Sequence, residues 1–128
     1  MSVETIRMAL GRLQDDPENE AAWNELAEAV TAPDPGVSNS EIERFLGMAR
    51  GRHEQRREWG AVAQLLELEI AFASGTPVEA PMQAELARIY QDELIDADKA
   101  LAAFQRLLQI RKEDATAIEA IEADEAKR

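Results

Sequence analysis

Apolar residues recur at spacings of three and four along almost the whole chain, and short stretches rich in Pro, Gly, Asp or Ser interrupt them. This periodicity is typical of amphipathic α-helices that pack through one face. We therefore expect an all-α fold of about seven helices, over approximately Val3–Leu13, Glu18–Thr31, 40–58, Trp59–Ala73, Glu79–Leu94, Ala97–Ile110 and Ala115–Lys127. The third of these helices frays into the charged run from Arg50 to Glu58.

Several residues predict where the helices begin and end. Ser2 is expected to cap the first helix, and Ser40 with Glu43 three residues later forms a capping-box pattern for the third. Asp16-Pro17 ends the first helix, and Pro33-Asp34-Pro35-Gly36 is the clearest break in the chain. The fourth helix is apolar over more than half of its circumference, so it should be buried between neighbours.

Two stretches share an internal spacing. Residues 16–30, DPENEAAWNELAEAV, place Trp23, Leu26-Ala27 and Val30 after the Asp16-Pro17 turn. Residues 86–114 carry Leu86-Ala87, Tyr90, Ala100, Phe104 and Leu108. The first stretch resembles the turn and first helix of a tetratricopeptide repeat, and the second resembles the body of another repeat. Two features depart from that family's pattern: the loop between Tyr90 and Ala100 is one residue longer, and Lys112 stands where the turn proline is expected.

The resemblance implies a right-handed stack of antiparallel helix pairs, a tetratricopeptide-like α-solenoid. We expect a single domain over residues 1–128, with candidate sub-units 1–36, 37–75 and 76–128. The middle sub-unit aligns in two registers, with either Leu46-Gly47 or Phe45-Leu46 at the close-contact positions. Related arrays such as HEAT-like repeats remain an alternative, and the last helix is either a cap or the first helix of a further repeat.

Such stacks bind peptides or helices of other proteins on a concave face lined by the first helix of each pair. The family's inward-facing positions fall on Asn24, Glu28, Arg88 and Gln91, so these are the candidate partner-binding residues. Only Asn24 and Arg88 are of the type that clamps a terminal carboxylate, which disfavours such a clamp. The resemblance thus implies a non-enzymatic protein-interaction module or scaffold. The alternative is a structural or self-associating segment of a larger helical-repeat assembly, pairing through a terminal face at Ile118 and Ile121.

Charge narrows the choice of partner. The chain of 128 residues has 26 Asp+Glu against 14 Lys+Arg, a formal net charge of −12. A charge of this sign repels nucleic acids and anionic membranes, and it favours a basic protein or peptide. The absence of cysteine excludes disulfides and thiolate metal sites. No basic stretch leads into an apolar run at the start, and no apolar run reaches 18 residues, so a cytoplasmic location without membrane insertion is expected.

Candidate chemistry is sparse. A single histidine, His53, has no Ser, Cys or acid at motif spacing, so no catalytic residues are assigned. The basic island of Arg50, Arg52, His53, Arg56 and Arg57 could steer an acidic segment, but it also fits a helix end that favours cations. The acidic stretch Asp92, Glu93, Asp96, Asp98 lacks the glycine and closing glutamate of an EF-hand. The sequence therefore predicts neither a metal nor a cofactor, and a small helical enzyme is the least favoured class.

Overall fold

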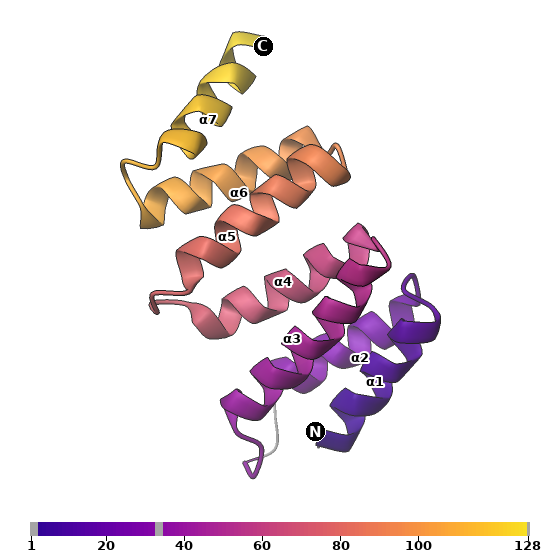
Figure 1. Ribbon diagram of the computed structural model, residues 1–128. Helices are drawn as coiled ribbons and strands as arrows, with labels where there is room; N and C mark the ends of the chain where they lie inside the picture. The colour runs from indigo at the N-terminus through magenta and orange to yellow at the C-terminus, as the bar shows by residue number, and fades with distance from the viewer. Residues whose placement is uncertain (1–2, 33–34, 128) are drawn as a thin grey trace. The chain divides into compact units, whose positions relative to one another are not determined.

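The computed structural model describes residues 3–32 and 35–127, and their regular secondary structure is entirely helical (Figure 1). This confirms the prediction of an all-α fold. The helices are α1 (Val3–Asp15), α2 (Glu20–Thr31), α3 (Asn39–Gln55), α4 (Trp59–Ala73), α5 (Glu79–Arg88), the π-helical turn η1 (Ile89–Glu93), α6 (Ala97–Ile110) and α7 (Ala115–Lys127). The predicted fifth helix is thus an α-helix that ends in a π turn.

Side-chain caps account for the start of four helices. Asn19, Ser38, Asp96 and Asp114 each accept a hydrogen bond from the backbone N–H three residues later, at 3.0–3.2 Å. These bonds satisfy N–H groups that have no partner within the helix. The predicted cap at Ser40 is wrong, because α3 begins two residues earlier and Ser38 caps it instead. The predicted cap at Ser2 and the break at Pro33-Asp34 lie outside the described residues.

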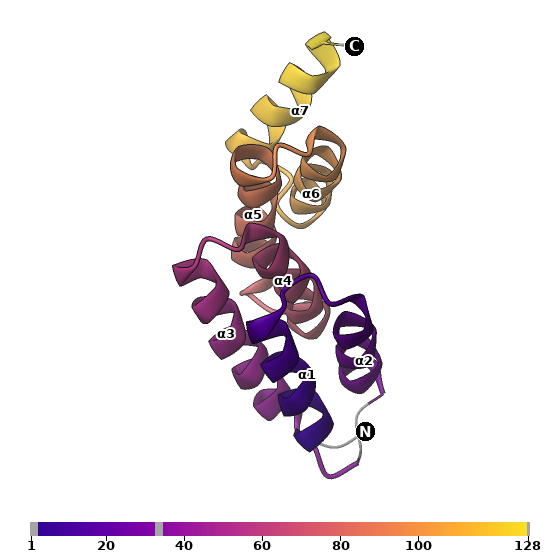
Figure 2. The ribbon, with the colours of Figure 1, turned by 90° about the vertical axis from the view of Figure 1, so that its right-hand side faces the viewer.

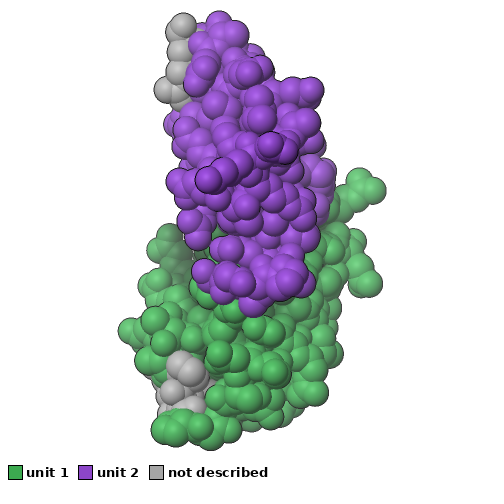
Figure 3. All heavy atoms as spheres, turned by 90° about the vertical axis from the view of Figure 1, so that its left-hand side faces the viewer, with its two compact units in different colours: residues 1–72 green, residues 73–128 purple. Residues whose placement is uncertain are grey.

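The chain divides into two compact units, Met1–Phe72 (unit 1) and Ala73–Arg128 (unit 2), which Figure 3 shows in different colours. The division lies close to the predicted sub-unit boundary at residue 75, and the predicted boundary at residue 36 falls inside unit 1. Each unit has its own buried apolar residues. The two units are therefore described separately.

In unit 1, α1 contacts both α2 and α3 (Figure 2). Its fully buried face, Ile6, Ala9 and Leu13, forms a core with apolar residues of α2, α3 and α4. Because α2 packs against the helix that precedes it, α2 is the second helix of a hairpin, whereas the resemblance assigns residues 16–30 to the first helix of a pair. In α3, Leu46 is fully buried and its neighbours Phe45 and Gly47 are partly exposed.

In unit 2, α6 is the central element and contacts α5, η1 and α7. Its buried residues are Ala100, Ala103, Phe104 and Leu107, spaced three, one and three apart along one helical face. The alanines on this face let neighbouring helices approach closely. Among the described residues of the whole chain, no helix is both long enough and apolar enough to cross a membrane.

A buried ion pair joins α3 to α4. Arg50 donates from Nε to Glu69 Oε2 at 2.6 Å and from Nη1 to Glu54 Oε1 at 2.8 Å. Burial raises the pKa of the Glu69 carboxyl, and the Arg50 guanidinium opposes that shift. Burial acts to lower the pKa of Arg50, but its carboxylate partners raise it above the usual value. Both pKa values are therefore raised, which favours the charged form of Arg50 and disfavours that of Glu69. Because an Arg side chain stays protonated in proteins, the pH dependence of this pair comes from Glu69.

The turn between α3 and α4 depends on a residue in the left-handed region. Arg57 has φ 57°, and the N–H groups of Arg57 and Glu58 donate back to the carbonyls of Glu54 and His53 at 3.0 Å. This is the Schellman pattern that ends many helices, in which glycine is the usual left-handed residue. The turn fixes the point at which α4 begins.

We expect Arg57→Gly to raise the free energy of unfolding by about 1 kcal/mol, because glycine adopts positive φ without the Cβ clash that Arg57 carries. Thermal unfolding followed by circular dichroism measures the change. The control is Arg56→Gly, at a position in the right-handed helical region, which should give no gain. A loss of stability in Arg57→Gly would show that its side chain outweighs the strain of its backbone.

The raised pKa of Glu69 predicts a pH dependence of stability. A carboxyl that binds its proton more tightly in the folded protein lowers the free energy of unfolding as the pH rises from its ordinary pKa of 4.5 through the raised value. Glu69→Gln lacks this titration, so the stability difference, wild type minus variant, should fall between pH 4.5 and neutral pH. Denaturant unfolding at a series of pH values tests this, with the exposed Glu122→Gln as control. A difference that rises with pH would contradict the assignment.

Candidate functional site

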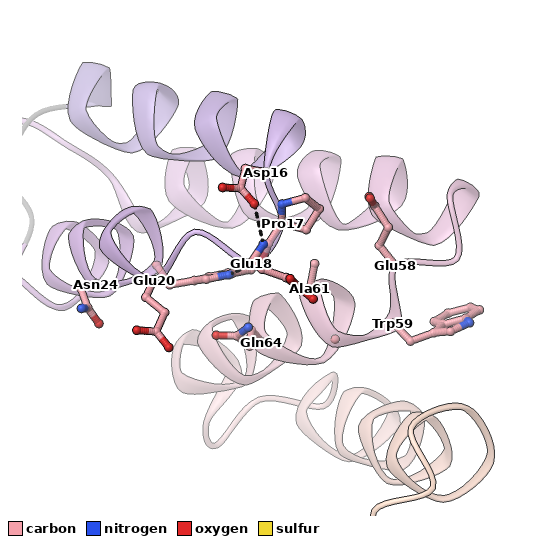
Figure 4. A pocket seen from close by; sticks show the side chains of 11 residues that line it. Asp16, Pro17, Glu18, Glu20, Asn24, Glu58, Trp59, Ala61 and Gln64 are labelled. Atoms are coloured by element: carbon pink, nitrogen blue, oxygen red, sulfur yellow. Dashed lines mark hydrogen bonds between the residues drawn. The ribbon is translucent and has the colours of Figure 1, made fainter.

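Unit 1 contains an open groove between the start of α2 and the start of α4, with a volume of about 820 Å³. We call it the α2–α4 groove (Figure 4). Its floor includes the buried side chains of Trp23 and Ala61. Asn24 and Trp59 lie at opposite ends of the view in Figure 4. The residues that line it are Asp16, Pro17, Glu18, Glu20, Trp23, Asn24, Glu58, Trp59, Gly60, Ala61 and Gln64.

One wall of the groove is the loop between α1 and α2. The indole N–H of Trp23 donates to the carbonyl oxygen of Pro17 at 2.8 Å, and this bond ties the loop to the first turns of α2. Asp16 Oδ1 accepts from the backbone N–H of Glu18 at 3.3 Å, the bond drawn in Figure 4. These bonds hold the exposed carboxylates of Asp16 and Glu18 at the rim of the groove.

The opposite wall follows from the turn after α3. His53 is 2% exposed, and its Nδ1 lies 2.8 Å from Oε1 of Glu58. Because an ionised carboxylate can only accept a hydrogen bond, this contact requires a proton on Nδ1. His53 therefore fixes Glu58 from within the core, while Trp59 and Gln64 extend the wall along α4.

The electrostatics of the α2–α4 groove are strongly one-sided. Four carboxylates, those of Asp16, Glu18, Glu20 and Glu58, line the groove, and no Lys or Arg is among the lining residues. Part of this charge complements the positive ends of α2 and α4, which both begin at the groove. Beside the carboxylates, Trp59 offers a partly exposed aromatic side chain and Asn24 an exposed amide. The groove therefore combines acidic, amide and aromatic groups.

The structure places the predicted partner-binding residues in both units. Asn24 lines the α2–α4 groove, and Glu28 is exposed one turn further along α2. In unit 2, Arg88 pairs with Glu85 at 2.7 Å and Glu93 at 3.6 Å, and hydrogen bonding to Glu85 raises its pKa. Gln91 is exposed in η1. Only Asn24 of these four lies in the α2–α4 groove.

The four arginines of the predicted basic patch differ in their contacts. Arg50 is engaged by Glu69 and Glu54, as described above. Arg52 and Arg56 both reach the last turn of α1, where Arg56 donates to the backbone carbonyl of Gln14 at 2.8 Å and Arg52 to its side-chain oxygen at 3.3 Å. Cations here complement the negative end of α1. Arg57 is exposed in the turn before α4.

The acidic stretch of unit 2 has structural partners. Asp96 caps α6, and Glu93 pairs with Arg88. Within residues 3–32 and 35–127, no group of three His, Asp or Glu side chains is arranged to hold a metal ion. Asp96 and Glu93 therefore have structural roles in unit 2, as a helix cap and as an ion-pair partner.

Reasoning from the sequence did not find Glu58, Trp59 and Gln64. They lie far along the chain from Asp16 and Asn24, and no motif links the two stretches. The only available signal was the pair Glu58-Trp59 directly after the basic run, where a large aromatic begins an apolar helix. That signal shows that a helix begins there, but it does not show what lies opposite.

No protein-family model matches the chain, and comparisons with curated proteins and with solved structures give no match. The geometry and charge of the α2–α4 groove are therefore the observations that bear on which partner this protein binds.

We expect Trp23→Phe to lower the free energy of unfolding by about 1 to 2 kcal/mol, because it removes the hydrogen bond to Pro17 and some buried volume. Urea unfolding followed by circular dichroism measures this loss. An unchanged midpoint would show that the Pro17 contact does not hold the loop. The chain has two tryptophans, so the variant also leaves Trp59, which lines the groove, as its single tryptophan.

Proposed function

We propose that this chain is a non-enzymatic protein-interaction module that binds a basic segment of another protein in the α2–α4 groove. The observation that carries the proposal is the pairing of four carboxylates with a partly exposed tryptophan in a groove whose lining includes no cation. A Lys or Arg side chain of the segment can pair with Glu18 or Glu20, and another part of the segment can contact Trp59 at the other end of the view in Figure 4. An acidic partner would meet only repulsion there.

The helical architecture supports the proposal. Neighbouring helices contact each other in the pairs α1–α2, α5–α6 and α6–α7, so the module we propose is built from helices that are adjacent in the sequence. In this proposal Asn24 belongs to the partner-binding surface, together with groove residues that the resemblance does not supply. Because the groove is open and polar, it suits an extended segment better than an enclosed small molecule.

The expected mode of binding follows from the exposure of the acids. Exposed ion pairs are each worth little, about 0.2–1 kcal/mol, so several must act together. Such a groove gives fast, salt-sensitive association more than high affinity. The alternative proposal, a self-associating segment of a larger assembly, predicts instead that copies of this chain bind each other.

Peptide titration tests the proposal. In the wild-type chain, whose two tryptophans both line the groove, tryptophan fluorescence is followed as synthetic peptides with alternating Lys or Arg and apolar residues are added, beside matched peptides that carry Glu. We expect saturable binding of the basic peptides only, weakened by added salt. Adding Glu18→Gln and Glu20→Gln should weaken binding roughly five- to tenfold, since two ion-pairing carboxylates are lost.

The matched control is the pair Glu4→Gln and Glu113→Gln, two exposed carboxylates that do not line the groove, which changes the net charge equally. It should leave the affinity within about twofold, because the groove keeps its carboxylates. Equal weakening by both pairs would mean that the peptides respond to overall charge and would overturn the groove assignment. Self-association without peptide binding would favour the alternative.

A further inference from the structure

The end of η1 is held in an unusual conformation. The N–H of Leu94 donates to the carbonyl of Ile89 at 2.9 Å, and the N–H of Asp96 donates to that of Tyr90 at 2.8 Å. Between them, Ile95 has φ 50°. This left-handed capping position normally belongs to glycine, and a β-branched residue is especially strained there. The chain therefore carries a residue that its local backbone disfavours.

Burial does not compensate for that strain. The side chain of Ile95 is 75% exposed, and its neighbour Leu94 is 38% exposed. Glycine at position 95 would suit the backbone better and would remove little buried apolar surface. Strained residues that the fold does not need are often found at functional sites. Exposed, strained Ile95 thus points to a contact outside the chain.

Ile95 stands at the edge of an apolar hollow in unit 2, which we call the α6–α7 hollow. Its volume is about 210 Å³. Small side chains on both helices leave the space open, and Leu101 and Phe104 give it an apolar floor. The residues that line it are Gln91, Ile95, Ala97, Ala100, Leu101, Phe104, Ala120, Ala123, Asp124 and Lys127. A hollow between two helices, with an isoleucine at its edge, fits the knob-like side chains of a third helix.

The charges around the hollow indicate what flanks that helix. The segment 92–98, which contains Ile95, carries four carboxylates, and of the acidic residues of α7 Asp124 lines the hollow. Of the nearby cations, Lys99 lies over the ring of Tyr90 at 5.7 Å, and Lys127 lines the hollow. The surroundings are therefore mainly acidic. A second copy of a chain with net charge −12 is disfavoured by like-charge repulsion.

We propose that Ile95 and the α6–α7 hollow form a second docking surface, for an amphipathic helix of another protein whose apolar stripe is flanked by Lys or Arg. The apolar stripe enters the hollow against Leu101 and covers Ile95. The basic flanks face the carboxylates of η1 and α7. This surface lies wholly in unit 2, so it is independent of the α2–α4 groove in unit 1.

The test uses a fluorescein-labelled synthetic amphipathic helix with a Leu stripe and Lys on its other faces, and fluorescence anisotropy as the readout. Ile95→Gly and, separately, Ala123→Gln are compared with the wild type. The first removes the exposed apolar side chain, and the second fills the hollow without changing the charge. Each should weaken binding about tenfold or more, because a large apolar contact is lost. The melting temperature of Ile95→Gly should be equal to or above that of the wild type.

The control variant is Val78→Ser, which removes another exposed apolar side chain of unit 2 outside the hollow, and it should bind as the wild type does. A control peptide with the same Leu stripe and Glu in place of Lys should not bind. Three results would overturn the proposal: equal binding by Ile95→Gly, a lowered melting temperature in that variant, or a wild-type dimer in sedimentation velocity that Ile95→Gly abolishes. The last result would identify a second copy as the occupant.

Discussion

The ion pair of Arg50 with Glu69 sets the relation between α3 and α4, on which the rest of unit 1 depends. Burying both charges costs several kcal/mol of desolvation, so the pair contributes more to a unique arrangement than to net stability. An unpaired carboxylate at position 69 would be strongly unfavourable, which disfavours packings of α4 that separate it from Arg50. With α3 and α4 joined in this way, the turn between them places Glu58 and Trp59 in the same groove as Asp16 and Trp23. The α2–α4 groove is a consequence of that arrangement.

The charged side chains of unit 1 have two roles: some hold helices together, and others form an exposed acidic surface. Arginines of α3 and of the turn after it contact other helices: Arg50 pairs with the buried carboxylate of Glu69, and Arg52 and Arg56 reach the last turn of α1. Several carboxylates, by contrast, remain exposed at the groove, where no cation lines the surface to neutralise them. These three arginines are thus engaged by the fold, whereas the groove keeps an excess of acid. This distribution explains how a chain with net charge −12 can fold stably and still present a directed acidic surface.

Local sequence signals were sufficient for most helix boundaries, because caps and breakers act over three or four residues. Asp96 and the Asp16-Pro17 turn behave as their chemistry requires. The cap at Ser38 was missed because Ser38 and Ser40 are each followed three residues later by a glutamate, Glu41 and Glu43, so the pattern alone could not separate the two. The groove was out of reach for a different reason. It joins residues around 16–24 to residues around 58–64, and nothing in either stretch specifies the other. Asn24 was found only through a resemblance, and its neighbours Glu58 and Gln64 were not found.

The segment between Tyr90 and Ala100, which the resemblance makes one residue longer than the repeat pattern, includes most of the π turn η1. A π turn contains more residues than an α turn, so a helix can accommodate an additional residue there. Tyr90 and Ala100 are buried, whereas Leu94 and Ile95 between them are exposed. Both non-glycine residues with positive φ in the described chain, Arg57 and Ile95, adjoin a hollow surface. Arg57 belongs to a standard helix-ending pattern with a hydrophilic side chain, and its strain is explained by the turn. Ile95 also lies at a helix end, but its side chain is β-branched and 75% exposed, so burial within its own unit does not offset the strain of its backbone.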